Sequence, residues 1–101
     1  MANTAKVLFR GAATTNTNTV LYTVPNSTST VVTNIVVTNT SSNPATFTIS
    51  LDGVIFAPTV AISGFSITSL DVKQVLASTE TLTGGASATN INFHISGMEI
   101  A

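Results

Sequence analysis

Cysteine and tryptophan are absent from this chain of 101 residues, and charged residues make up only 7% of it. Without cysteine there can be no disulfide framework and no thiolate zinc site. The three basic residues, Lys6, Arg10 and Lys73, are too few for a protein that binds nucleic acid by neutralising phosphates, so we expect no nucleic-acid partner. The 44% hydrophobic content and net charge of −1 are the reverse of the signature of disorder.

Long hydrophobic runs are also missing. The longest candidate, residues 54–62, is interrupted by Pro58 and Thr59, whereas a membrane-spanning helix needs about 20 apolar residues. No apolar stretch follows Lys6 and Arg10, so the N-terminal segment does not resemble a signal peptide. We therefore expect no membrane partner and synthesis without export. Hydroxyl and amide residues take the place of the missing charges: the chain has 19 Thr, 11 Ser and 9 Asn.

A length near 100 residues corresponds to one ordinary domain, so we expect a single domain over residues 1–101. Two polar segments lack the pattern of a core element. We expect residues 1–5 to form a flexible N-terminal arm and residues 11–18 to form a second arm.

Apolar and polar residues alternate with a period of two, which is typical of strands with one face on a core. The clearest case is residues 45–52. Asp52-Gly53 predicts a two-residue hairpin turn, and the return strand should run from Val54 to about Pro58. Residues 73–78 could form one helical turn and no more. The other predicted strands are residues 6–10, 19–24, 30–38, 65–72, 79–86 and 91–100.

The apolar residues change face within two of these strands, which predicts bulges near Thr68–Ser69 and at Gly97. Gly84-Gly85 fits a bulge or a close approach of another backbone. About seven or eight short strands separated by turn signals predict an all-β, antiparallel, two-sheet sandwich. The pattern is compatible with a jelly-roll and with an immunoglobulin-like topology.

The residues that could carry chemistry are few and scattered. Asp52, Asp71, Glu80 and Glu99 fall in separate turns and strand ends, so we expect no functional pair of carboxylates. His94 is the single imidazole and lies on a polar face, which favours a position on the surface or at a subunit contact. A metal site would need further His or Cys ligands. We expect no catalytic residue, no cofactor and no metal site, and therefore no enzyme.

Valines occupy both faces of the strand predicted over residues 30–38, so this strand should be covered on both sides or should meet a neighbouring chain. The predicted strand edges also lack the lysines that commonly block edge-to-edge pairing. We therefore expect a homo-oligomer. The candidate subunit contacts are Leu8, Val32 and Val36.

Three segments, residues 20–40, 45–53 and 92–100, resemble small virion proteins of tailed bacteriophages. In those proteins a Leu-Tyr-Thr-Val-Pro motif is followed by a hydroxyl-rich turn and a long valine-rich strand, and the chain closes on Ser-Gly-x-Glu-Ile. The corresponding residues here are Leu21–Pro25 and Ser96–Ile100. The resemblance covers most of the chain and implies a structural virion component without catalytic residues.

On this basis we expect a capsid decoration (cement) protein, with a trimer favoured, that is made in the host cytoplasm. It would bind the major capsid protein on the outside of the head shell. One alternative is a virion protein associated with the tail, neck or fibre. A more remote alternative is a carbohydrate-binding module, which shares the sandwich architecture but usually presents aromatic residues that are scarce here.

Overall fold

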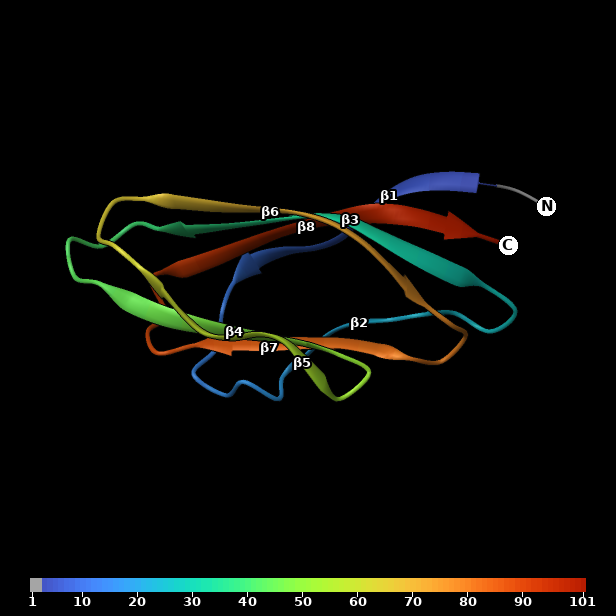
Figure 1. Ribbon diagram of the computed structural model, residues 1–101, viewed down its shortest axis with the longest axis horizontal. Coiled ribbons are helices and arrows are strands. Elements are labelled where there is room, and N and C mark those ends of the chain that lie inside the picture. The colour runs from blue at the N-terminus through green and yellow to red at the C-terminus, as the bar shows by residue number, and fades with distance from the viewer. Residues whose placement is uncertain (1–2) are drawn as a thin grey trace.

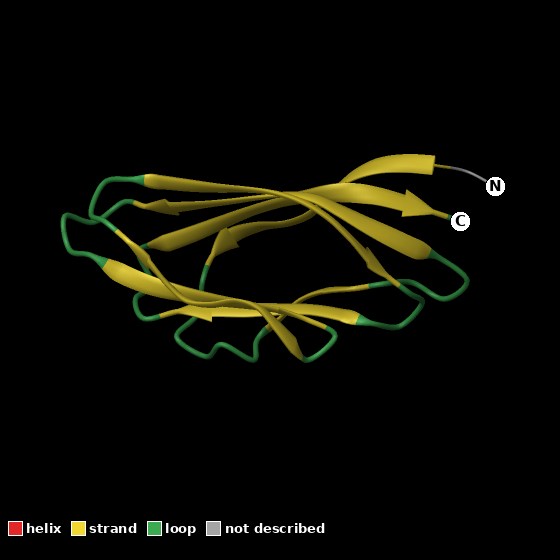
Figure 2. Cartoon of the chain, viewed as in Figure 1, coloured by secondary structure: helices red, strands yellow, loops and turns green. Residues whose placement is uncertain are grey.

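The computed structural model describes residues 3–101, which form eight strands and no helix. The strands make two antiparallel sheets of four that pack face to face as a β-sandwich, as predicted (Figure 1). Loops and turns are the only other structure, as Figure 2 shows. The described residues contain no helix that could cross a membrane. The strands are β1 (Asn3–Ala12), β2 (Val20–Thr23), β3 (Ser29–Asn39), β4 (Ala45–Leu51), β5 (Val54–Ile62), β6 (Ile67–Leu76), β7 (Thr81–Ala86) and β8 (Ile91–Ile100).

Strand order decides between the two topologies that the pattern left open. The first sheet has the order β1-β8-β3-β6 and the second has the order β2-β7-β4-β5; they form the upper and lower layers of Figure 1. The chain is thus four nested antiparallel pairs: β1 with β8, β2 with β7, β3 with β6 and β4 with β5. Only β4 and β5 are consecutive neighbours within a sheet, whereas an immunoglobulin-like sandwich pairs several consecutive strands. The sandwich is therefore a jelly roll.

Side chains from both sheets meet in one core. Phe47 of β4 and Phe93 of β8 are at most 1% exposed, and their rings pack edge to face with centroids 6.3 Å apart. β4 shows the predicted alternation, because Ala45, Phe47 and Ile49 are buried while the threonines between them are half-buried. The strand with the clearest period of two in the sequence therefore supplies one wall of the core.

β3 changes face once along its length, which explains why both of its faces carry valine. Thr33 is an extra residue opposite Ser96–Gly97 of β8. Because successive side chains of a strand point to opposite faces, the extra residue places Val32 on the core side together with Ile35 and Val37. All three side chains have no exposed surface. The sequence pattern therefore suggested valines on two faces of this strand partly because the bulge reverses the direction in which the side chains point.

Register shifts cross the whole first sheet at this level. Leu8 is an extra residue of β1 opposite Ile95–Ser96, and β6 places Val72 and Lys73 opposite the single residue Thr33. The irregularity predicted at Gly97 therefore lies at the right level of the sheet. However, the extra residues belong to the neighbouring strands and not to β8 itself.

Two glycines leave room for a neighbouring backbone. A Cβ atom on Gly97 would lie 2.4 Å from the carbonyl oxygen of Val31, and one on Gly85 would lie 2.4 Å from the carbonyl oxygen of Asn16. No side chain fits within such distances in a close-packed interior. The close backbone approach considered for Gly84-Gly85 is confirmed at Gly85, where the connection between β1 and β2 passes β7.

The bulge predicted near Thr68–Ser69 is wrong. β6 pairs with β3 without interruption over residues 67–71. Phe65 and Ile67 had suggested a change of face, but these side chains are exposed to solvent by 74% and 71%. The helical turn considered for residues 73–78 is also wrong, because β6 continues to Leu76.

The predicted hairpin between β4 and β5 is confirmed. Asp52 and Gly53 both have positive φ, 51° and 78°, as the two central residues of a type I′ turn require. β5 does not stop near Pro58 but continues to Ile62. Proline is tolerated there because β5 is an edge strand, so the missing N–H can face away from the only paired neighbour.

Most of the two segments expected as arms is ordered. Asn3–Ala5 belong to β1 and pair with β8, while residues 1 and 2 lie outside the described residues. Gly11 and Ala12 complete β1. The rest of the second segment is tied to β7, since the Ala86 N–H donates a hydrogen bond of 2.9 Å to the Thr14 carbonyl oxygen. The predicted second arm is therefore a fixed connection.

Candidate interaction surfaces

Two of the three residues expected to contact another subunit are buried inside this chain. Leu8 is 7% exposed and Val32 is 0% exposed, and both pack in the core between the sheets. The expectation assumed unbroken alternation along β1 and β3, and the register shifts turn these side chains inward. Val36 lies half-buried on the outer face of the first sheet, between His94 and Ser69 of the adjacent strands. It alone remains a candidate contact.

The edge strands carry features that hinder pairing with a strand of another chain. Four of the seven charged residues lie on the edges of the first sheet: Lys6 and Arg10 on β1, and Asp71 and Lys73 on β6. In the second sheet, β2 has only four residues and β5 contains Pro58. Charges, proline and short length all protect sheet edges. The expectation of unprotected edges is therefore wrong, because the few charges are concentrated there.

The two long sides of the sandwich differ. On the first, which we call the closed side, the edge strands β1 and β2 are in contact. On the second, which we call the open side, the edge strands β5 and β6 flank a groove. Any partner that approaches the sandwich from the side meets one of these two surfaces.

Side-chain bonds hold the sheets together on the closed side. The Tyr22 hydroxyl of β2 makes a hydrogen bond of 2.9 Å with Thr30 Oγ1 of β3 and donates another to the Glu99 carboxylate of β8. Glu99 also accepts a bond of 3.1 Å from Lys6 Nζ, the single ion pair within residues 3–101. Burial and the bond to Glu99 raise the pKa of Tyr22, while the bonds from Tyr22 and Lys6 lower the pKa of Glu99.

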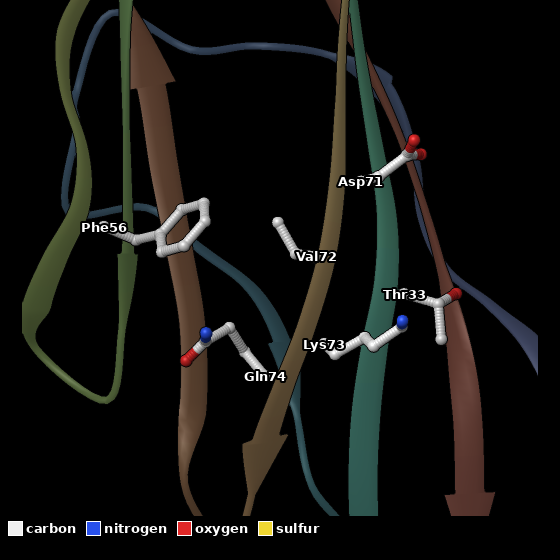
Figure 3. Close-up of a pocket in the computed structure, with 6 residues that line it drawn as sticks. All are labelled: Thr33, Phe56, Asp71, Val72, Lys73 and Gln74. Atoms are coloured by element: carbon white, nitrogen blue, oxygen red, sulfur yellow. The ribbon is translucent and has the colours of Figure 1, made fainter.

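The open side has a groove of about 610 Å³ between the two sheets. Figure 3 shows Phe56 of β5 pointing into it from one wall, and Val72 and Gln74 of β6 pointing into it from the other. Phe56 and Val72 are half-buried, so the floor of the groove is apolar. Thr33, Asp71 and Lys73 also line it, but Figure 3 shows their side chains on the other side of β6, pointing away from Phe56.

Large apolar side chains are most exposed on this same side. The described residues include eight exposed large hydrophobic side chains, and five of them belong to β5, β6 or the loop between these strands. The five are Val54 (71%), Ile55 (60%), Phe65 (74%), Ile67 (71%) and Val75 (67%). The other three, Val7, Val20 and Met98, are 36–56% exposed. The open side is therefore the more apolar of the two long sides.

The open side also holds a carboxylate pair that the sequence reasoning missed. Asp52 in the β4–β5 turn lies close to Glu80 in the β6–β7 connection, and the pKa of Asp52 is raised, because its protonated form can share a proton with Glu80 and its charged form is repelled by it. The two residues meet because β4 and β7 are paired with Leu51 opposite Leu82. Both acids line a second, smaller pocket of about 240 Å³ together with Ile55, and this pocket shares Phe56 and Gln74 with the groove. Nothing in the local pattern around either residue indicates this pairing.

Within residues 3–101, no group of three or more His, Cys, Asp or Glu side chains is placed to hold a metal ion. His94 is half-buried on the outer face of the first sheet, opposite Arg10 of β1 and Val36 of β3. The open-side groove is therefore the feature best suited to binding, and its lining suits a macromolecular surface with apolar and basic groups.

Comparisons with protein-family models, with curated proteins and with solved structures find no match to this chain. The resemblance to virion proteins thus rests on the sequence motifs. The fold brings those motifs together, since Leu21–Pro25 contains Tyr22 and Ser96–Ile100 contains Glu99. These two side chains form the hydrogen bond of the closed side. The motif residues therefore have a structural role in this chain.

Proposed function

We propose that this chain is a structural protein of the virion of a tailed bacteriophage, where it decorates and stabilises the head shell. Two facts support the proposal besides the sequence motifs. The jelly roll is a common architecture of viral capsid proteins. The motif residues Tyr22 and Glu99 bind the two sheets to each other, which favours a rigid structural part.

The observation that carries the proposal is the apolar open side. Large exposed patches of apolar side chains on a soluble protein mark sites of protein interaction. Here Phe65, Ile67 and Val75, which belong to β6 or to the loop before it, are at least 67% exposed. A protein attached at many equivalent points of a lattice gains from multivalency, so each single contact can be modest. A groove of this size with few charges suits such repeated contacts.

Copy number tests the proposed role. Quantitative mass spectrometry of purified virions that contain this chain should find it in numbers comparable to those of the major capsid protein. A few copies per particle would instead indicate the tail, neck or fibre. Absence from purified particles would overturn a virion role altogether.

Rebinding to stripped heads tests which surface is used. Ile55→Asp places a charge on the apolar open side and should strongly reduce the occupancy of the heads. Val20→Asp is the matched control, because Val20 is exposed to a similar extent, 56% against 60%, but lies on the closed side. Equal occupancy for both variants would contradict attachment through the open side.

A further inference from the structure

The charged side chains are divided between the two long sides of the sandwich. The closed side has a net charge of +1, from Lys6, Arg10 and Glu99. The open side has a net charge of −2, from Asp52, Asp71, Lys73 and Glu80. Opposite sides of one molecule are therefore complementary in charge.

The groups that create this complementarity lack internal partners of opposite charge. Arg10 is exposed and forms no ion pair within residues 3–101. On the open side, Asp52 and Glu80 lie against each other, and Asp71 is bonded to the neutral amide of Asn34 at 3.3 Å. A basic group of a partner would therefore reduce the repulsion between the carboxylates of the open side. A carboxylate of a partner could form an ion pair with Arg10 on the closed side.

The size of these sides suits a stable contact. The Cα atoms extend over 45 × 21 × 18 Å, and Figure 1 is viewed down the shortest axis, so one long side measures about 45 × 21 Å, or roughly 900 Å². A standard protein interface covers about 800 Å² on each partner. Apolar side chains are exposed on both sides, including Val7 and Val20 on the closed side and Ile55 and Val75 on the open side. Each side thus has the area, the apolar groups and the charge to match the other.

We propose that the open side of one copy of this chain binds the closed side of a second copy, with Arg10 of the second copy against Asp71 at the groove of the first. Such a contact joins two different surfaces, so it is heterologous. Repetition of a heterologous contact builds a closed ring when the rotation closes and an open filament when it does not. The edge charges, Pro58 and the short β2 disfavour continuous sheet pairing between copies, so the contact is made by side chains.

Charge reversal tests the contact. Sedimentation velocity and light scattering over a wide concentration series should show self-association of the full chain. Arg10→Asp and Asp71→Arg should each weaken association about tenfold or more, because placing like charges opposite each other costs several kcal/mol. The double variant, Arg10→Asp with Asp71→Arg, should recover most of the lost association, because the pair is restored with its charges exchanged.

Asn26→Glu is the control, because it adds a charge at the exposed β2–β3 turn, away from both sides, and should associate like the original chain. Circular dichroism melts establish that every variant is folded. A chain that stays monomeric at all concentrations overturns the proposal, and so do single variants that associate normally or a double variant that does not recover. A copy whose open side holds a second copy cannot bind the head shell with that side, so the contact belongs to copies that are not attached in this way. The measurement uses the free chain and needs no virion, so its failure is distinguishable from a failure of the proposed role.

Discussion

The closed and open sides are both formed by edge strands, yet their side chains interact differently. On the closed side, Tyr22, Thr30, Glu99 and Lys6 form a chain of bonds between the two sheets. On the open side, the corresponding space is a groove, and the acids Asp52 and Glu80 are held close enough to repel each other. The closed side bonds Lys6 and Glu99 within the chain and leaves only Arg10 without an ion pair within residues 3–101, whereas the acids of the open side have no basic partner there.

This difference shows where stability and interaction reside in the molecule. The closed side pairs Lys6 with Glu99 and buries the side chain of Leu8 from β1 in the core. The open side exposes apolar side chains to water. This exposure does not stabilise a monomer, and it is typical of a surface that binds a partner. We expect substitutions of the bonded or buried residues of the closed side to change folding, and substitutions on the open side or at the unpaired Arg10 to change association.

The largest expected effect is a contrast between two isomeric side chains. Leu8→Ala on the closed side should lower the free energy of unfolding by about 2–5 kcal/mol, because Leu8 is 7% exposed and its removal leaves a cavity. Ile55→Ala on the open side should change it by less than about 0.5 kcal/mol, because Ile55 is 60% exposed. Urea unfolding measures both values. Similar decreases in the free energy of unfolding for the two variants would contradict the different roles given to Leu8 and Ile55.

Two glycines give the next contrast. Gly97→Ala should cost about 1–3 kcal/mol, because its Cβ would overlap the Val31 backbone. Gly53 has open space around it but a φ of 78°, so Gly53→Ala should cost about 1 kcal/mol through backbone strain. Asparagine accepts positive φ. Thermal unfolding should therefore show that Asn is tolerated at position 53 and not at position 97, and the reverse result would refute these two explanations.

The smallest expected effects are on pH dependence, and they have opposite signs. The folded-state pKa of Glu99 is lowered, so its bonds stabilise the protein above the unfolded pKa and this stabilisation is lost as the pH falls through the folded value. The folded-state pKa of Asp52 is raised, first by hydrogen bonding of its protonated form with Glu80 and then by burial and repulsion, so the protein is destabilised as the pH rises through the raised value.

Melting temperatures measured between about pH 3 and pH 7 test both statements. Glu99→Gln should lower the melting temperature near neutral pH and flatten its fall toward acid. Asp52→Asn should raise the melting temperature near neutral pH and have little effect in acid. The comparison between the sides fails if both variants shift the melting temperature in the same direction at neutral pH.

The sequence predicted the sandwich because strand periodicity is a local property. Residues 45–51 and the turn at Asp52–Gly53 behave as the pattern indicates, since neighbouring residues alone set the alternation and the positive φ values. The same reasoning failed where a strand depends on its partners. Leu8 and Val32 were assigned outward because the extra residues in β1 and β3 are defined only relative to β8.

The candidate site was predicted poorly for a related reason. The pattern placed Phe65 and Ile67 on a strand face, and it gave no sign that Asp52 meets Glu80. The alternation of apolar and polar residues along one strand does not indicate which edge strands lie next to each other in the folded chain. Jelly-roll nesting decides that β5 lies across from β6 and β1 lies across from β2.

The amino-acid sequence by itself determined that the chain is all-β, where its strands lie and how the β4–β5 hairpin turns, because alternation and turn chemistry act over a few residues. Only the tertiary structure decided the strand order, the burial of Leu8 and Val32 and the separation of a closed side from an open one. These features depend on contacts between residues far apart in the chain, such as Tyr22 with Glu99. Such contacts form only once the sheets have paired and packed.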